Sequence, residues 1–291
     1  MVAITTQLSG SVATYIWQWQ TQSITVTYET LGTGQPILLL PAFSTVSSRT
    51  ELATLANNLA EQYQVTILDW PGFGDSDRLR LPYGPALYQQ FLRDFVAAQF
   101  SQPIPVIAAG HASGYVLAMA TAWSKIALVA PTWKGPLAAM GAPDTLRSGM
   151  RELVRTPLVG SFLYWLNTRP GFLKWMYRRH VFVDETQLTP DYIAQRYQGT
   201  QQTGARYAPA AFVTGGLDPV SSREAFLAYF QSLTMPVMVI VGENAPPSSK
   251  AEMEAMAVLL QVQSVALPGT LGMAEEYGQG VAKTVLAFLQ Q

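Results

Sequence analysis

Apolar and polar residues alternate in two short stretches near the start of the chain, residues 13–20 and 24–29. A period of two is typical of half-buried strands, and these two stretches are close enough to form an antiparallel pair. From residue 36 the pattern changes to short, continuous apolar runs, which are typical of parallel strands buried on both faces. These runs cover residues 37–40, 65–68, 106–109, 126–130 and 237–241, and a weaker sixth run covers 262–267.

Amphipathic stretches that are long enough for crossover helices lie between the runs. They cover residues 50–61, 85–100, 112–123, 222–233, 249–260 and 274–289. Strands that alternate with helices predict an α/β fold with a mostly parallel sheet flanked by helices. The alternation stops between residues 133 and 214, where helical stretches occur without a convincing strand. We therefore expect a core made of residues 1–132 and 215–291, with residues 133–214 inserted as a helical cap.

The composition narrows the chemistry that this fold can carry. The 291 residues include two histidines and no cysteine. Disulfides, thiolate nucleophiles and thiolate metal sites are therefore excluded, and a histidine-rich metal site is disfavoured. Any mechanism that needs an imidazole must use His111 or His180. We expect neither a metal ion nor a cofactor.

Charge and hydropathy suggest where the protein acts. The first ten residues show no basic stretch followed by an apolar core, and no apolar run approaches the ~18 residues of a membrane span. These features predict a cytoplasmic protein. The net charge of −1 conceals a division, because residues 133–214 hold ten Lys/Arg against five Asp/Glu and the remainder holds eight against fourteen. A basic cap is therefore expected on an acidic core.

Two turns that follow apolar runs carry glycine motifs. Residues 69–76 read Asp-Trp-Pro-Gly-Phe-Gly-Asp-Ser, and residues 110–114 read Gly-His-Ala-Ser-Gly at the start of a predicted helix. In these motifs the chain resembles the lidded α/β-hydrolase superfamily, in which the first pattern follows the fourth strand and the second forms the nucleophile elbow. An elbow needs small residues two before and two after its central position. Gly110 and Gly114 meet that requirement if Ala112 is central.

The resemblance implies a Ser/Asp/His triad, but the matching positions are vacant in this sequence. Ala112 occupies the nucleophile position and has no reactive group. Ala245 occupies the acid position, and the alternative acid position at residues 131–133 carries no carboxylate. Leu271 or Gly272 occupies the histidine position. Three losses are not explained by one engineered substitution.

Polar residues near the vacant positions are expected either to replace a missing catalytic group or to have a structural role. Ser113 and Glu243 are the weak candidates for a displaced nucleophile and acid. His111 is expected to pack at the base of the elbow, and His180 is expected on the basic surface of the cap. The backbone N–H groups of Phe43 and Ser113 are expected to form a shallow nest that accepts an anion.

Four aspartates are expected to have structural roles. Asp69, Asp75 and Asp77 belong to the glycine-rich turn, where they would cap the next helix or order the loop. Asp218 lies where the cap returns to the core and is expected at a hinge or a helix start. A ligand contact is the alternative for each of them.

The cap carries the strongest indication of a binding surface. Between residues 159 and 183, seven aromatic residues are interleaved with four basic ones. The aromatic residues are expected either to roof an apolar pocket, as in lidded α/β hydrolases, or to form a surface for an anionic membrane or an acidic protein. Trp175, Arg178 and Arg179 are the residues expected on that surface. Nucleic acid is disfavoured, because the chain is slightly acidic and carries no nucleic-acid motif.

Three functions follow as hypotheses. The first is a pseudoenzyme that binds an apolar or amphipathic molecule between core and cap, in the cytoplasm or at the periphery of a membrane. The second is a hydrolase that acts on an ester of an apolar alcohol or acid by a non-standard mechanism. The third is an assembly protein that docks through the basic cap. The residues expected to line the pocket of the first hypothesis are Phe43, Ser44, His111, Ala112, Ser113 and Trp133.

Overall fold

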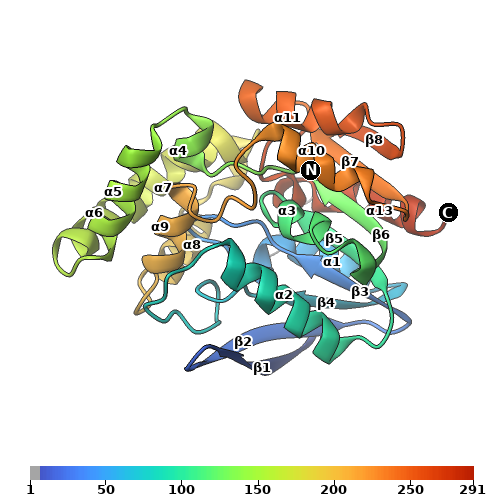
Figure 1. Ribbon diagram of the computed structural model, residues 1–291, viewed down its shortest axis with the longest axis horizontal. Coiled ribbons are helices and arrows are strands. Elements are labelled where there is room, and N and C mark those ends of the chain that lie inside the picture. Colours follow the sequence, from blue (N-terminus) through green and yellow to red (C-terminus); the bar gives the residue numbers. More distant parts are fainter. Residues whose placement is uncertain (1–6) are drawn as a thin grey trace.

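Eight strands form one sheet in the computed structural model, which describes residues 7–291 (Figure 1). The strand order is β1-β2-β4-β3-β5-β6-β7-β8. β2 is antiparallel to β1 and to β4, and all other neighbouring strands are parallel. The predicted mostly parallel sheet with an antiparallel entry is confirmed. The strands are β1 (Ser11–Trp19), β2 (Gln22–Leu31), β3 (Gln35–Leu40), β4 (Tyr63–Leu68), β5 (Ile104–Ala109), β6 (Trp123–Val129), β7 (Val237–Gly242) and β8 (Val262–Leu267).

The expectation that the chain begins without a leader falls partly on residues 1–6, which lie outside the described residues. Among residues 7–291, no helix is both long and apolar enough to cross a bilayer.

Helices cover both faces of the sheet, which is why its central strands are apolar throughout. α1, α12 and α13 pack together on one face, and α2, α3 and α10 pack together on the other (Figure 1). α11 packs against β7 and β8 at the edge. The core helices are α1 (Ala53–Leu59), α2 (Pro85–Gln99), α3 (Ala112–Leu117), α10 (Arg223–Gln231), α11 (Pro247–Ala257), α12 (Met273–Glu276) and α13 (Gly278–Leu289), with short 3₁₀ turns at Arg49–Leu52 and Ala120–Ala122.

Two core helices are shorter than their amphipathic patterns predict. The helix expected over 112–123 ends at Leu117, because Trp123 already begins β6 and donates from its indole N–H to the Val116 carbonyl. The stretch 274–289 is divided at Tyr277 into α12 and α13. The divided segment packs closely on α1, since a Cβ atom at Gly278 would lie 2.8 Å from the Thr54 Cβ. Tertiary packing overrides the local pattern at both points.

Residues 133–214 contain helices and no strand. They share a small apolar cluster that includes Leu173, Tyr177, Phe182 and Ile193, and Val46 from the β3–α1 loop joins it. The chain therefore folds as predicted in this segment, while its division from the core as a separate unit stays a prediction. The segment contains α4 (Pro136–Ala139), α5 (Asp144–Arg155), α6 (Val159–Thr168), α7 (Pro170–Met176), a π-helical turn at Tyr177–Val181, a 3₁₀ turn at Glu185–Gln187, α8 (Pro190–Thr200) and α9 (Tyr207–Val213).

Candidate functional site

Gly110 forms the tip of the sharp turn between β5 and α3. Its φ of +51° lies in the left-handed region, which favours glycine. Ala112, which the sequence predicts at the centre of this turn, is instead the first residue of α3 and is fully buried. The left-handed residue of this turn is therefore Gly110, two residues before the position that the sequence predicts as central. Neither Gly110 nor Ala112 carries a group that could act as a nucleophile.

The surroundings of Gly110 leave little room for a side chain at that position. A Cβ atom there would lie 2.9 Å from the Cβ of Ala42, in the loop after β3. The Gly110 carbonyl accepts the backbone N–H groups of Ser113 and Thr132 at 3.3 and 3.1 Å. The Ser113 N–H thus has a partner inside the turn, and the nest that the sequence predicts for it with the Phe43 N–H stays a prediction.

His111 is a buried, neutral residue beside this tip. Its side chain is inaccessible, and its Nε2 lies 2.9 Å from the Leu217 carbonyl oxygen, which also accepts the Tyr115 hydroxyl at 2.7 Å. Burial lowers the pKa of His111 to about 4, so the imidazole is uncharged near neutral pH. The rings of Phe43 and Phe212 meet it edge to face. The geometry suits the packing role expected at the base of the elbow.

The acid position after β7 offers no usable carboxylate. Ala245 is buried, while the neighbouring Glu243 is exposed, and its backbone carbonyl accepts the Lys250 ammonium at 3.1 Å. A carboxylate in solvent does not orient a buried base. Glu243 therefore lacks the surroundings that its proposed role as a displaced acid requires.

The histidine position lies in a loop that is fastened to the cap. The Gly272 N–H and the Thr270 hydroxyl both donate to the carbonyl of Val181, at the end of the π-helical turn. A Cβ atom at Gly272 would lie 2.3 Å from a methyl group of Val181. This contact excludes any larger side chain at Gly272, and Leu271 brings no titratable group.

The six residues expected to line a ligand pocket are mostly packed against protein. Phe43, His111, Ala112, Ser113 and Trp133 have exposed fractions of 3%, 1%, 0%, 0% and 3%. Ser44 is half-buried, and its hydroxyl accepts the Val46 N–H at 3.1 Å. Within residues 7–291, the Ser113 hydroxyl has no hydrogen-bond partner. Without a partner, this hydroxyl has no base that would activate it.

Aromatic rings fill the region above the elbow. Phe43 stacks on Trp70 with ring centroids 4.8 Å apart and meets Tyr88 edge-on at the same distance. Trp133 stacks on Phe226 and donates its indole N–H to Glu252. Two surface hollows, of about 600 and 390 Å³, lie elsewhere, over α1 and α13 and beside β2 and β4. The ligand pocket between core and cap stays a prediction.

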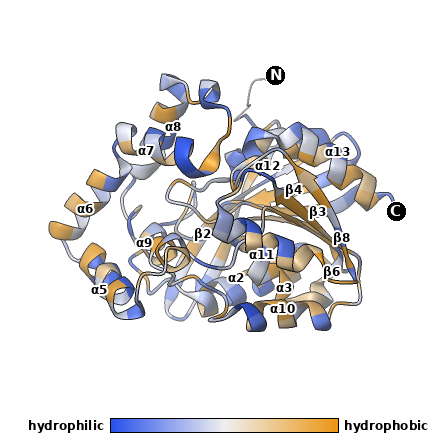
Figure 2. Ribbon diagram, turned by 90° about the horizontal axis from the view of Figure 1, so that it is seen from above, coloured by the Kyte–Doolittle hydropathy of each residue, from blue (hydrophilic) through white to orange (hydrophobic). Residues whose placement is uncertain are grey.

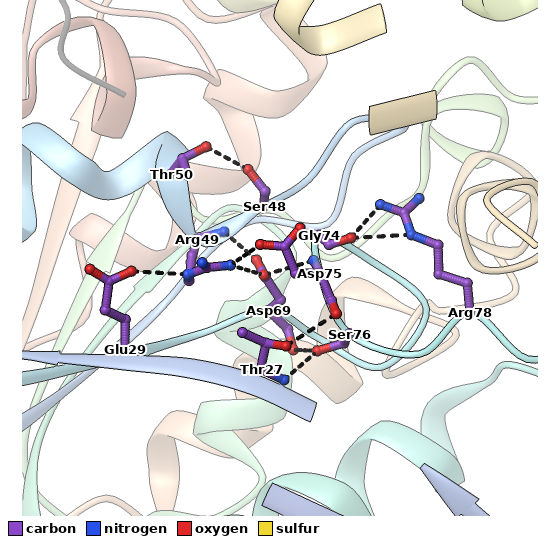
Figure 3. Close-up of polar contacts among 10 residues, drawn as sticks. All are labelled: Thr27, Glu29, Ser48, Arg49, Thr50, Asp69, Gly74, Asp75, Ser76 and Arg78. Carbon is purple, nitrogen blue, oxygen red and sulfur yellow. Dashed lines mark hydrogen bonds and ion pairs between the residues drawn. The ribbon is translucent and has the colours of Figure 1, made fainter. Parts of the chain in front are cut away.

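A buried ion network organises the glycine-rich turn (Figure 3). Arg49 forms ion pairs with Glu29, Asp69 and Asp75, and the Asp69 carboxylate also accepts the backbone N–H groups of Arg49 and Asp75 at 2.6 and 2.9 Å. Asp77 accepts the Thr25 N–H at 2.7 Å. These contacts give the three aspartates of the turn the loop-ordering duty that the sequence predicts.

A second buried ion pair joins the cap to the core. Arg196 on α8 pairs with Glu275 on α12, and their side chains are 3% and 6% exposed. The Tyr192 hydroxyl donates to the same carboxylate at 2.8 Å. Burial raises the pKa of Glu275, and the positive charge of Arg196 opposes that shift. The sequence interpretation missed this pair.

Asp218 lies where the cap returns to the core, as expected. Its carboxylate accepts the Gly135 N–H at 2.7 Å and lies 3.5 Å from His111 Nε2. Burial raises the pKa of Asp218 to about 7, although Gly135, Arg147 and Arg151 act in the opposite direction. The half-buried Asp218 thus ties the end of the cap to its beginning at Gly135. Among residues 7–291, no group of three or more His, Asp or Glu residues is placed to hold a metal ion.

Comparison with known proteins decides the family. The model of the alpha/beta hydrolase family matches residues 37–281. The chain belongs to the alpha/beta hydrolase family. None of the curated proteins is significantly similar to it.

Solved structures with this alpha/beta hydrolase fold share little sequence with the chain. A thermophilic esterase from Thermogutta terrifontis is 20% identical, with a TM-score of 0.71 over 96% of this chain and 98% of that one. A bromoperoxidase from Bacillus anthracis is 16% identical, with a TM-score of 0.72 over 96% and 100%. An enol-lactonase from Burkholderia xenovorans LB400 is 15% identical, with a TM-score of 0.69 over 92% and 97%. At these identities the likeness shows the fold alone.

The expected cap surface residues of this alpha/beta hydrolase are exposed. Trp175 is 56% exposed on α7, and Arg178 and Arg179 are exposed on the π-helical turn. His180 is half-buried beside Trp175. The ion pair between Arg196 and Glu275 joins residues that are 79 positions apart, so no local spacing predicts it. The one local sign is that two acidic residues, Glu275 and Glu276, follow Gly272 closely.

Proposed function

We propose that this alpha/beta hydrolase is non-catalytic and acts by docking through its cap. The observation that carries the proposal is the elbow itself, where neither Gly110 at the turn nor Ala112 at the centre of the motif offers a nucleophile. Ala245 and Gly272 support it independently, because both positions are closed by packing. Without nucleophile, base and acid, the standard route of acyl transfer has no first step.

The docking part of the proposal is supported by the surface of the cap. Among residues 7–291, sixteen large apolar side chains are exposed, and twelve of them lie in residues 133–214. Soluble proteins seldom gather exposed apolar side chains in one region unless something binds there. A ligand between core and cap remains a second candidate, since aromatic side chains meet at that junction. A native mass spectrum that reports a retained small molecule would favour it.

The test is turnover of a panel of nitrophenyl esters with short and long acyl chains. We expect rates equal to buffer, and no change in Ser113→Ala or Glu243→Gln, the two variants that remove the displaced candidates. The Thermogutta esterase, assayed beside it, is the positive control. Turnover above buffer that falls in either variant would overturn the proposal and favour a hydrolase of non-standard mechanism.

A further inference from the structure

α5 carries its apolar side chains on the outside. Arg147 and Arg151 turn inward, where both guanidinium groups donate to the Thr214 carbonyl at 3.2 Å. Leu146, Met150 and Leu153, which share another face at helical spacing, are 55%, 40% and 44% exposed. A surface helix normally buries such a stripe. This inversion leaves an apolar ridge on the outer side of the cap.

The turn between α5 and α6 presents a leucine at its tip. Leu158 is 86% exposed and has a φ of +46°, a region that leucine rarely adopts. The two helices are packed tightly behind it, since a Cβ atom at Gly160 would lie 2.0 Å from the Val154 carbonyl oxygen. Figure 1 shows this hairpin projecting away from the sheet. The fold thus holds an apolar side chain outward in a strained turn.

The ridge continues along the next two helices. On α6, Val159, Phe162 and Trp165 are 51%, 58% and 41% exposed, and on α7, Phe172 and Trp175 are 38% and 56% exposed. Figure 2 shows apolar segments along α5 and α6 at the edge of the molecule opposite the C-terminus. We call the exposed apolar side chains of residues 146–175 the cap ridge.

Positive charge accompanies the cap ridge. Residues 144–183 hold seven Lys/Arg and two Asp/Glu, and four of the seven, Arg169, Lys174, Arg178 and Arg179, are exposed. The Arg169 guanidinium lies 4.5 Å from the centroid of the Trp165 ring, and the other three lie within four residues of Trp175 in the sequence. Aromatic rings bordered by long cationic side chains match the boundary between acyl chains and anionic headgroups.

We infer that the cap ridge docks on the surface of an anionic lipid bilayer, with Leu158 inserted among the lipids. The inference rests on the proposed docking function and names its partner. Charge complementarity selects this partner, because the exposed basic side chains of residues 169–179, at the α7 end of the ridge, are attracted to acidic headgroups. Peripheral binding fits the helices, none of which in residues 7–291 is able to span the bilayer.

Vesicle flotation tests the inference with the full chain. We expect the protein to float with vesicles of phosphatidylcholine and phosphatidylglycerol, and to float much less with phosphatidylcholine alone or at high salt. Leu158→Asp is expected to reduce the bound fraction about tenfold. Aspartate tolerates a positive φ better than leucine, so this variant should fold. Leu260→Asp is the matched control, because Leu260 is 104% exposed on the core.

Charge reversal supplies the second arm. Lys174→Glu with Arg179→Glu is expected to abolish flotation with anionic vesicles, whereas Arg93→Glu with Lys283→Glu, an equal change on the core, is expected to leave it intact. Absence of flotation in the wild type would overturn the inference, as would equal loss in the cap and core variants. A dimer that Leu158→Asp dissociates, without flotation, would also overturn it, since a second copy would then cover the ridge. None of these outcomes alters the ester assay, which tests the missing catalysis separately.

Discussion

At the scale of single residues, Gly110 links backbone geometry to the loss of chemistry. A positive φ at the elbow tip is tolerated by serine in active hydrolases only because the surrounding structure enforces it. Here the tip is glycine, and Ala42 occupies the space that a side chain would need. Restoring a serine therefore faces a steric barrier as well as the absence of its partners.

Gly110→Ser is expected to lower the free energy of unfolding by about 1–3 kcal/mol, because it adds backbone strain and a contact with Ala42. It is not expected to create esterase activity. Chemical denaturation and the ester panel measure the two effects. Gly280→Ser is the control, since nothing lies within 4 Å of a Cβ atom there. Esterase activity in Gly110→Ser would contradict the vacancy of the other triad positions.

Asp218 predicts a pH dependence of stability. Its pKa of about 7 in the folded protein exceeds the ordinary value of 3.8, so its contribution is complete below pH 3.8 and is lost as the pH rises through 7. Asp218→Asn keeps the acceptor for the Gly135 N–H and cannot ionise, so the variant does not lose this stability as the pH rises. Relative to wild type, the variant should gain about 3 kcal/mol between pH 4 and 7, at roughly 1.4 kcal/mol per pKa unit.

Denaturant unfolding of both proteins across this pH range measures the difference. Glu254→Gln, which removes an exposed carboxylate on α11, is the control for the substitution itself. A difference between Asp218→Asn and wild type that stays constant with pH would contradict the assignment.

At the scale of elements, the contact between α8 and α12 fastens the cap. Arg196→Met would leave the Glu275 carboxylate buried without its cation, which is expected to cost about 3–5 kcal/mol of unfolding free energy. Arg178→Met is the matched control, because its pair with Glu185 is about half exposed and should contribute at most about 1 kcal/mol. Denaturation measures both variants. An equal decrease in the free energy of unfolding would show that the buried pair contributes no more to stability than the exposed one.

A substitution in the α5–α6 turn is expected to change stability and vesicle binding in opposite directions. Leu158→Gly should relieve the unfavourable φ and raise the free energy of unfolding by about 1 kcal/mol, while it weakens vesicle binding. Leu260→Gly should not stabilise the protein, since Leu260 lies outside the left-handed region. Thermal unfolding compares the two. A loss of stability in Leu158→Gly would mean that the leucine side chain packs on the fold.

The strands were predictable from the sequence, whereas the register of the elbow and the contact between cap and core were not. The buried strands were predictable because their apolar runs are continuous, and β7 illustrates this with six buried residues. The elbow register was not predictable, because Gly110–Gly114 and Ala108–Ala112 both satisfy the requirement for small residues. Only the φ of Gly110 separates them. The pair Arg196–Glu275 depends on how the cap folds back onto the core, and no local pattern encodes that contact.

At the scale of the whole molecule, the division of charge acquires a structural meaning. The basic segment predicted from the sequence coincides with the helices that carry the cap ridge, and the acidic remainder forms the sheet and its covering helices. A near-neutral chain can therefore approach an anionic surface in one orientation, with the cap leading. Under the proposed function, the core serves as the support that holds the cap.

The central claim, that the chain carries no hydrolase nucleophile, is tested most directly by intact-protein mass spectrometry after incubation with a fluorophosphonate. This reagent phosphonylates an activated serine and leaves other serines unmodified. The account predicts an unchanged mass under conditions in which the Thermogutta esterase is fully labelled. One stoichiometric adduct, absent from Ser113→Ala or from another single serine variant, would contradict it.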